Sequence, residues 1–356
     1  MNFLKDTQKF VKGKMVFCGI DIHKHHWSLC FFCEGTVVER LVIPGNFKSL
    51  HHHVLRFYNS AQRVKFVYEA GFSGFHLYRS LSSAGFECVI TPPNRVPSAD
   101  GKIKTDKRDA RKLARFLAGD LLKEIYVPSV SVETHRHLIR LRAGYQKKQT
   151  RVKNQIKSLL HLHGLMWPRE RGNKWTKRYI SWLESLELKE DILRYTLDQH
   201  LREYRFIRDQ IVDTTQRLKE LSMSEAYRVH FDRLTSCKGV GLITGMTFLL
   251  ELGDIHRFSS AIKFCGYIGL SPSQHSSGER VRLGHITREG NIHLRRALVE
   301  CSWTVIRYDQ FLREKYERIR AKGTNGKKAI VAVARSLAIR LRRCLLDETP
   351  YAMGIC

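Results

Sequence analysis

The first 120 residues alternate short apolar runs with helix-like stretches, and this alternation constrains the fold more than any other feature of the chain. Apolar runs typical of β-strands occupy residues 15–22, 27–33, 37–43, 64–68 and 87–91. Helical patterns occupy residues 47–58, 75–83 and 106–118. Strands and helices at this spacing predict an α/β domain built on a mixed sheet.

From about Ser131 the chain changes character. Between Ser131 and Ile180 there are 13 Lys and Arg residues but only two acids, Glu133 and Glu170. Apolar residues recur there with a helical and partly heptad-like period, which predicts long helices. With a second helical run at residues 191–221, this region forms either an ordinary helical hairpin or a coiled-coil arm whose basic face follows nucleic acid.

The rest of the chain is predicted to be mainly helical. The turn CKGVG at residues 237–241 is similar to the hairpin of helix–hairpin–helix DNA binders, because Gly-x-Gly can expose backbone N–H groups to a phosphate. Any helix–helix turn can use glycine in the same way. We therefore expect an N-terminal extension (1–14), an α/β domain (15–130), a basic helical region (131–225) and a mainly α C-terminal domain with this turn (226–350).

The charge of the chain points to a polyanionic partner. There are 62 Lys and Arg residues against 34 Asp and Glu, a formal net charge of +28. Such an excess favours nucleic acid, because neutralised phosphates release their counterions. No apolar run approaches the roughly 18 residues that span a bilayer, and the N-terminus lacks the pattern of a signal peptide. We expect a cytoplasmic protein without a membrane partner.

Two motifs have ordinary explanations. Cys30 and Cys33 form a CxxC without a second pair at zinc spacing, which favours buried cysteines on a strand. The run His51-His52-His53 is predicted to lie on a solvated helix face without a partner carboxylate, with metal binding a distant alternative.

Four acids occupy positions from which they can converge. Asp21 ends the first predicted strand and Glu69 follows the fourth, whereas Asp106 and Asp109 share one helical face near a first turn. Each acid alone also has a local explanation, as a helix cap, a first-turn acid or a turn residue.

Together these four carboxylates predict a metal site. Like charges at one place repel unless cations neutralise them, and hard oxygen ligands suit Mg²⁺, or Mn²⁺ in its place. Two such ions roughly 3.5–4 Å apart can activate an attacking oxygen and stabilise a leaving oxygen in phosphoryl transfer.

A second candidate site lies in residues 269–298, which we expect to be a polar loop followed by a helix. Ser277 precedes Gly278, and five arginines follow in sequence: Arg280, Arg282, Arg288, Arg295 and Arg296. A serine nucleophile needs activation, and clustered arginines can bind a phosphodiester. The GxSxG elbow of many serine hydrolases is absent. Considered alone, this segment could equally be a surface loop.

These two candidate sites, in this order and separated by basic helices, resemble the DEDD-type insertion-sequence transposases. That family includes bridge-RNA-guided serine recombinases and has relatives among the Piv-type DNA invertases. The resemblance rests on the strings GIDIHK, YEAGFSGFHLYRSL, KTDKRDARKLA, HGLMWPRERGNKWTKRYISWL, CKGVG, FCGYIGLSP and SSGERVRLGHITREGNIHLRRAL, together with the final basic helix. It implies a RuvC-like (RNase H-type) mixed-sheet domain, a coiled-coil insertion and a C-terminal transposase domain.

The resemblance also assigns roles. It implies that Asp21, Glu69, Asp106 and Asp109 bind Mg²⁺, and that Ser277 attacks DNA to give a phosphoserine link. Many relatives have an aromatic residue where His275 stands, and Ser276 adjoins Ser277, so the choice between these two serines stays open. Implied partners are donor and target DNA, a noncoding bridge RNA, and further copies of the chain in a dimer to tetramer, acting at a prokaryotic nucleoid. Expected nucleic-acid contacts come from basic residues near both sites and in the helical region: Lys104, Arg108, Lys147, Lys148, Arg151, Arg280, Arg282, Arg295 and Arg296.

Three functions remain open from the sequence. The first is a transposase or recombinase that uses both sites, with a site-specific DNA invertase as its close variant. The second is a metal-dependent, structure-specific nuclease in which the acids do all the chemistry. The third is a non-catalytic nucleic-acid-binding protein.

Overall fold

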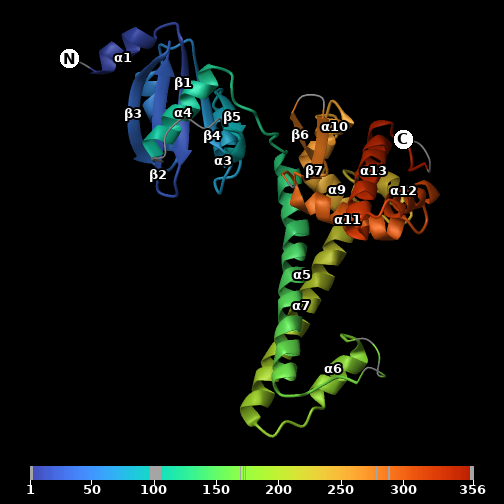
Figure 1. The fold of residues 1–356 in the computed structure, drawn as a ribbon. Coiled ribbons are helices and arrows are strands. Elements are labelled where there is room, and N and C mark those ends of the chain that lie inside the picture. Colours follow the sequence, from blue (N-terminus) through green and yellow to red (C-terminus); the bar gives the residue numbers. More distant parts are fainter. Residues whose placement is uncertain are drawn as a thin grey trace. The chain divides into compact units, whose positions relative to one another are not determined.

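The computed structural model describes residues 3–96, 106–168, 170, 172, 174–277, 280–287 and 289–352. The chain divides into two compact units, Met1–Val127 and Pro128–Cys356 (Figure 1). This division falls close to the expected limit between the α/β domain and the basic helical region. Each unit is described by itself below.

The first unit has a central sheet with helices against both faces. Its elements are α1 (Phe3–Val11), β1 (Met15–Ile22), β2 (His26–Cys33), β3 (Thr36–Pro44), α2 (Phe47–Phe57), β4 (Arg63–Glu69), α3 (His76–Ser83), β5 (Glu87–Thr91), the 3₁₀ turn η1 (Pro93–Arg95) and α4 (Asp106–Ala118).

The sheet has the order β3-β2-β1-β4-β5. The first three strands form an antiparallel meander, whereas β1 and β4 are parallel, as are β4 and β5. The short connection after β1 makes an antiparallel hairpin, and the longer helical connections α2 and α3 make the parallel crossovers. The predicted α/β architecture with a mixed sheet is confirmed.

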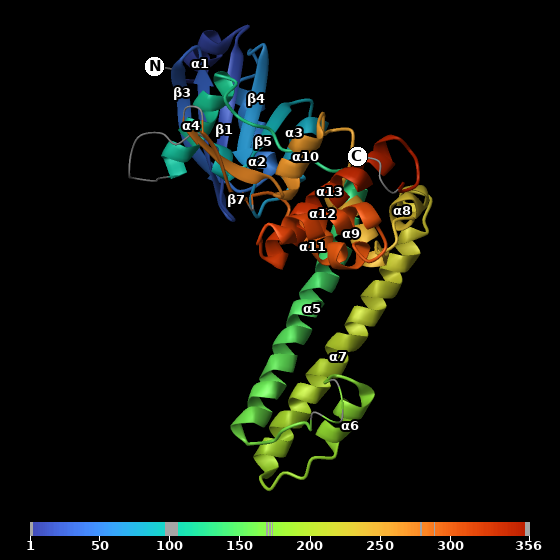
Figure 2. The same cartoon turned by 45° about the vertical axis from the view of Figure 1, so that its right-hand side comes forward.

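The two faces of the sheet follow from strand alternation. In β1, Val16, Cys18 and Ile20 are buried in the core that also contains the apolar side chains of α2 and α3. Phe17 packs on the other face, with Leu113 and Leu117 of α4. Because side chains alternate along a strand, every second residue from Phe17 onward belongs to the face that α4 covers (Figure 2).

Helix α4 lies directly on β1 at Gly19. A Cβ atom at Gly19 would lie 2.1 Å from the carbonyl oxygen of Ala110 and 2.6 Å from the amide nitrogen of Ala114. Backbone atoms of α4 therefore occupy the space that any larger residue would need. Ala110 and Ala114 pack beside Cys30 of the neighbouring strand, so small residues on both elements permit this close approach.

Two local predictions can now be compared with the structure. Cys30 packs under α4 whereas Cys33 packs in the core on the opposite face, as expected for cysteines on a buried strand. The prediction for the histidine run was wrong at His53. Its Nε2 lies 2.9 Å from an Oε2 atom of Glu39, and the side chains of the two residues are 13% and 12% exposed. The carboxylate comes from β3, a partner that sequence spacing does not reveal.

The second unit is almost entirely helical. Its elements are α5 (Val130–Leu162), α6 (Lys177–Glu184), α7 (Asp191–Ser222), α8 (Arg228–Thr235), α9 (Leu242–Leu252), α10 (Ala261–Ile268), β6 (Pro272–Ser277), β7 (Arg280–Ile286), α11 (Ile292–Val305), α12 (Gln310–Ala321) and α13 (Gly326–Leu346).

Helices α5 and α7 lie side by side, and α6 packs near one end of the pair; we call these three helices the helical arm (Figures 1 and 2). The arm has its own apolar cluster, in which Ile156 of α5 and Leu201 of α7 are buried. Trp167, Tyr179 and Trp182 stack edge to face in the same cluster. The predicted long helical pair is confirmed.

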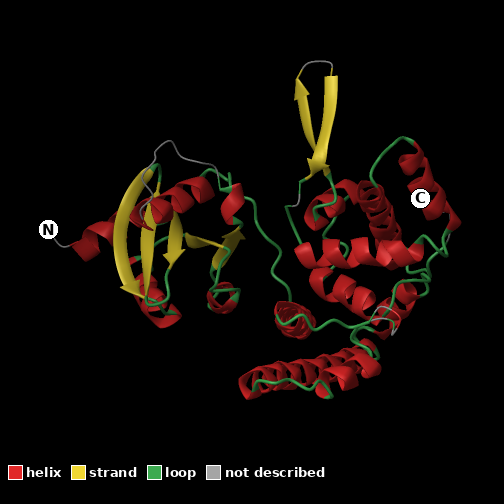
Figure 3. Ribbon diagram, turned by 60° about the horizontal axis from the view of Figure 1, so that its bottom comes forward, coloured by secondary structure: helices red, strands yellow, loops and turns green. Residues whose placement is uncertain are grey.

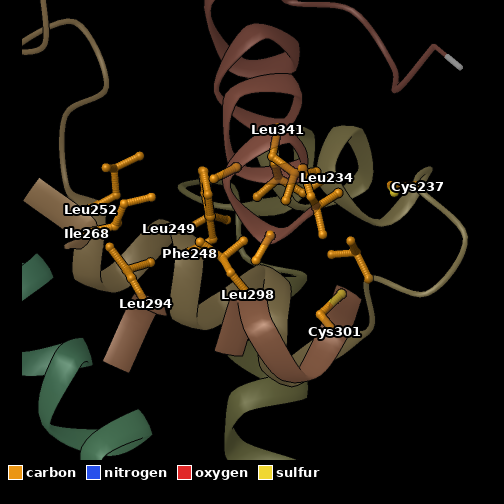
Figure 4. Close-up of a cluster of buried hydrophobic side chains, with 14 of the residues drawn as sticks. Leu234, Cys237, Phe248, Leu249, Leu252, Ile268, Leu294, Leu298, Cys301 and Leu341 are labelled. Atoms are coloured by element: carbon orange, nitrogen blue, oxygen red, sulfur yellow. The ribbon is translucent and has the colours of Figure 1, made fainter. Parts of the chain in front are cut away.

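The remaining helices share the largest core of the unit. Figure 4 shows Phe248 and Leu252 of α9, Leu294 and Leu298 of α11, and Leu341 of α13 in this core. Helix α9 is buried along most of its length, which explains why its sequence is apolar all round rather than amphipathic.

The serine segment is the main departure from the predicted secondary structure. Residues 272–286, expected to be loop-like, contain the antiparallel strands β6 and β7, which stand out from the helices as a hairpin (Figure 3). Strand β6 (PSQHSS) contains no apolar residue after Pro272, and β7 alternates charged and apolar residues only over Arg280–Leu283, so the sequence offers too little of the alternation by which strands are predicted. Helix α12 and the N-terminal helix α1 were also absent from the predicted elements.

Among the described residues, no helix is both long and apolar enough to cross a membrane.

Candidate active site

Asp21 and Glu69 lie side by side at one end of the sheet. Strands β1 and β4 are parallel with Ile20 beside Tyr68, so the next position brings Asp21 beside Glu69. Alternation places both on the face covered by α4, because Gly19 and Val67, two residues earlier on each strand, contact that helix. Both residues are half-buried. The structure therefore brings these two predicted acids together.

The helix α4 contributes the third described acid. Asp109 is half-buried and directly precedes Ala110, whose carbonyl oxygen lies against Gly19. Since Gly19 is two residues before Asp21 on the same face of β1, the start of α4 lies over the strand end that carries Asp21. Asp106 begins this helix, one turn before Asp109, and its side chain lies outside the described residues.

Three further side chains surround these acids and were missed from the sequence. The Nε2 atom of His23 lies 3.2 Å from an Oδ2 atom of Asp21. Ser28 is buried directly opposite Asp21 on β2, and Thr91 is buried beside Glu69 on β5. Only His23 carried a sequence signal, namely its position two residues after Asp21; the other two depend on strand register.

The donor set fits a hard divalent cation. Carboxylates at two adjacent strand ends and on the covering helix supply the oxygen ligands that Mg²⁺ and Mn²⁺ prefer. The buried Thr91 hydroxyl beside Glu69 makes no hydrogen bond within the described part of the chain, so a polar group is still available at this edge. Within the same residues, no group of three His, Cys, Asp or Glu side chains is already gathered closely enough to hold a metal ion.

The hairpin that carries Ser277 is fixed at its base. Gly269 ends α10 with φ +69°, and a Cβ there would lie 2.3 Å from the carbonyl oxygen of Glu289. Gly290 has φ +103°, and a Cβ there would lie 2.1 Å from the carbonyl oxygen of Tyr267. Both glycines are needed for the backbone to pass this closely in a left-handed conformation. The side chains of Ser277 and Ser276 lie outside the described residues.

A buried carboxylate connects this base to the helical arm. Glu251 of α9 is fully buried and accepts two hydrogen bonds from Arg140 of α5, at 2.7 and 2.8 Å. It accepts a third, at 2.8 Å, from Asn291, which caps α11 through the amides of His293 and Leu294. Burial alone would raise the pKa of Glu251, but the hydrogen bonds from Arg140 and Asn291 lower it overall. We call Glu251, Arg140 and Asn291 the Glu251 network.

The predicted nucleic-acid contacts fall into three groups. Lys147, Lys148 and Arg151 are exposed on α5, and Arg296 is exposed on α11. Arg295 is half-buried and donates to the carbonyl oxygen of Ile268, beneath the hairpin. The others lie outside the described residues, either entirely or in their side chains: Lys104, Arg108, Arg280 and Arg282.

The turn between α8 and α9 is tightly packed on one side. Gly239 has φ +105°, and a Cβ there would lie 3.1 Å from the amide nitrogen of Val305. Close packing on α11 therefore accounts for this glycine. Lys238 and Gly241, on either side of it, are exposed.

Two family models match the chain. One is a transposase model for DEDD transposases of the IS110 kind, which matches residues 18–164. The other describes the transposase IS116/IS110/IS902 family and matches residues 231–317. The first match contains Asp21, Glu69, Asp106 and Asp109, and the second contains Ser277.

Curated relatives carry transposase names. The chain is 33% identical over 244 residues to a protein of Sinorhizobium fredii named "Putative transposase y4qE", a match that covers 68% of this chain and 59% of that relative. It is 25% identical to the transposase for insertion sequence element IS1533 of Leptospira borgpetersenii, over 95% of this chain and 97% of the relative. It is 26% identical to the transposase for insertion sequence element IS1111A of Coxiella burnetii, over 94% and 91%.

Proposed function

The chain belongs to the DEDD-type insertion-sequence transposases, and from this premise we propose that it cuts and joins DNA during excision and integration of an insertion sequence. One observation carries the proposal. Asp21 and Glu69 meet at adjacent strand ends, on the face where Gly19 lets the acidic start of α4 pack against the sheet.

We infer that the first unit is a RuvC-like, RNase H-type nuclease domain. Its antiparallel meander followed by two parallel strands, with acids at the ends of β1 and β4 and on the last helix, supports this assignment. Asp21, Glu69, Asp106 and Asp109 would hold Mg²⁺ or Mn²⁺. The bound cation would supply a Lewis acid for the phosphoryl oxygens of the DNA.

Ser277 is the proposed nucleophile. Its hydroxyl oxygen attacks the phosphorus of a DNA phosphodiester, a P–O bond to serine forms, and the P–O bond to the leaving sugar oxygen breaks. The serine proton passes to that leaving oxygen, so the products are a phosphoserine link and a free sugar hydroxyl. A DNA hydroxyl then attacks the phosphoserine and reverses the exchange at a new junction. Two observations support the proposal: the second family match contains Ser277, and the backbone packs closely at the base of its hairpin.

A structured noncoding RNA is the proposed guide. The chain has a net charge of +28 and presents exposed cations along α5, and none of the motifs identified in its sequence reads bases directly. RNA that copurifies with the chain, maps to the DNA beside its gene and pairs with both junctions is the expected finding. Full transposition without any RNA would instead favour an invertase-like mode of site selection.

The test is strand transfer on DNA that carries the ends of the element. Ser277→Ala and Asp21→Asn should each abolish transfer, whereas Ser276→Ala and Asp6→Asn should retain it. Asp6 is an exposed acid on α1 and therefore controls for a lost negative charge. If Ser277→Ala still cleaves with Mg²⁺, the chain is a metal-dependent nuclease in which the acids suffice.

We further propose that the acids and the serine act in a homo-oligomer of two to four chains. Mixing the inactive Asp21→Asn and Ser277→Ala chains tests whether the two sites come from different copies. Restored strand transfer in the mixture supports shared sites, and no recovery contradicts them.

A further inference from the structure

A cleft lies between α5, α9 and α11 of the second unit. It has a volume of about 500 Å³ and is lined by residues of these three helices. This volume is within the range of small-molecule and cofactor sites, which are usually concave with an apolar floor and a few polar groups.

Apolar residues from all three helices form part of the lining, and we call them the floor of the cleft. Ile139 of α5 is 5% exposed, and Ile243 of α9 lines the same space. Ala143 of α5 and Ala297 of α11 are the small residues among the lining. A flat ring can lie on such a surface without losing hydrogen bonds to water.

One wall of the cleft offers hydrogen bonds. Gln146, Gln149 and Thr150 follow one another along α5. The Thr150 hydroxyl donates to the carbonyl oxygen of Gln146, whereas the two amide groups can each donate and accept. Amide side chains of this kind match the mixed donor and acceptor edge of a nucleobase.

The rim of the cleft is positive. Lys147 and Arg296 line it from opposite helices, α5 and α11. Arg296 lies 3.1 Å from Glu300, one turn later on its own helix. Burial lowers the pKa of His293, which also lines the cleft; Glu251 raises it, and Arg140, Lys147 and Arg296 lower it further. Glu300 also lines the cleft, so three cations, Arg142, Lys147 and Arg296, accompany one carboxylate, and the lining as a whole favours an anion.

The Glu251 network joins the three helices that line the cleft. Arg140 lies next to Ile139 on α5, and Asn291 caps the helix that carries His293 and Arg296. Since Glu251 of α9 bonds to both, all three walls are joined by hydrogen bonds before any ligand arrives. A preformed site loses less conformational entropy on binding.

We propose that this cleft binds one unpaired nucleotide of a nucleic-acid strand, with its base on the apolar floor and its phosphate at Lys147 and Arg296. The inference rests on the proposed nucleic-acid function, because it assigns a further contact to the same substrate. A duplex keeps its bases stacked and paired, so only a single-stranded or extruded nucleotide can enter.

The experiment measures the affinity of the full chain for three probes of one mixed sequence: a 12-nucleotide RNA strand, the same DNA strand, and the 12-base-pair DNA duplex. Ala143→Phe and Ala297→Phe each fill the cleft without changing charge. We expect either substitution to weaken binding of a single strand by about tenfold, while duplex affinity stays unchanged. The strand that loses more identifies RNA or DNA as the source of the nucleotide.

Lys147→Ala tests the phosphate contact without filling the cleft. The slope of log affinity against log salt for the single strand should become shallower by about 0.7. The matched controls are Ala321→Phe and Lys322→Ala at the exposed end of α12, which should behave like wild type. A single strand carrying one 5-iodouracil should also cross-link to α5 or α11.

Equal losses for strand and duplex, or unchanged strand affinity in all three variants, would overturn the proposal. None of these readouts depends on DNA cleavage. A chain that binds strands through the cleft but never forms phosphoserine would disprove the proposed chemistry and leave the cleft assignment intact.

Discussion

The two units surround their buried or half-buried carboxylates with different kinds of neighbour. In the second unit, Glu251 is fully buried and receives hydrogen bonds from Arg140 and Asn291. In the first unit, Asp21 and Glu69 are only half-buried and share one face with the acidic start of α4. A carboxylate that is sealed by cationic and amide donors has completed its interactions. Carboxylates gathered in partial contact with solvent still favour a cation.

The comparison therefore separates a structural acid from functional ones. Removing Glu251 should cost stability, because it is fully buried and accepts hydrogen bonds from both Arg140 and Asn291 that would be lost. Removing the charge of Asp21 should cost activity and little stability, because Asp21 is half-buried and the amide of asparagine can still bond to His23. The following changes test this contrast, beginning with the largest expected effect.

Asp21→Asn should reduce strand cleavage at least about 10³-fold, because one ligand of the proposed cation is lost. The free energy of unfolding should stay within about 1 kcal/mol of wild type. Cleavage rates with Mg²⁺ and urea denaturation measure the two effects. A large loss of stability with cleavage retained would reverse the assignment.

Glu251→Gln should lower the free energy of unfolding by about 2–3 kcal/mol, because the buried amide loses the charged hydrogen bonds from Arg140, while the 43% exposure of Arg140 lets water compensate its charge in part. Denaturation of the full chain by urea provides the measurement. Glu225→Gln is the control, because Glu225 is exposed, and it should change stability by less than about 0.5 kcal/mol. If the two variants have the same free energy of unfolding, the Glu251 network does not stabilise the packing of α5 against α9 and α11.

Gly19→Ala should affect both properties moderately. The new Cβ would clash with backbone atoms of Ala110 and Ala114, so α4 must shift away from β1 and carry Asp109 with it. We expect a loss of about 1–3 kcal/mol in stability and of up to about 100-fold in cleavage.

The control for this change is Gly144→Ala, within α5, where a Cβ meets no atom within 4 Å. Alanine there should stabilise the helix by up to about 1 kcal/mol. Wild-type cleavage by Gly19→Ala would show that the position of α4 on β1 does not matter to the site.

The smallest effect concerns pH. The pKa of Glu251 is lowered in the folded chain from its ordinary value of 4.5, so its ionised form stabilises the fold. That contribution is complete above the unfolded pKa and disappears as the pH falls through the lower folded pKa. Wild type should therefore lose stability more steeply below pH 4.5 than Glu251→Gln does, as measured by denaturation at stepped pH. Parallel curves would contradict the lowered pKa.

The sequence allowed more of the first unit to be predicted than of the second. Asp21 and Glu69 could be found because each lies at the end of a buried strand, and buried strands can be recognised in a sequence as short apolar runs. Their adjacency could only be expected, since it depends on the register of β1 and β4. The places of Thr91 and Ser28 depend on strand register, and the pairing of His53 with Glu39 depends on how α2 packs on β3. No local pattern reveals any of them.

The second unit was harder to predict for a physical reason. Strand β6 contains no apolar residue after Pro272 and β7 alternates charged and apolar residues over only four positions, so the hairpin was expected to be a loop. Glu251 lies within an apolar helix, and nothing nearby in sequence shows that Arg140 and Asn291 neutralise it. Tertiary contacts between distant segments decide both features.

The most direct test of the account is the mass of the protein–DNA adduct, mapped to its residue. Wild type, incubated with Mg²⁺ and DNA carrying the element's ends, should yield a nucleotide on Ser277 after digestion and mass spectrometry. Asp21→Asn should yield none, although it folds and binds the same DNA. An adduct that persists in Ser277→Ala, or that forms at the wild-type rate in Asp21→Asn, would contradict a chemistry that needs both the acids and the serine.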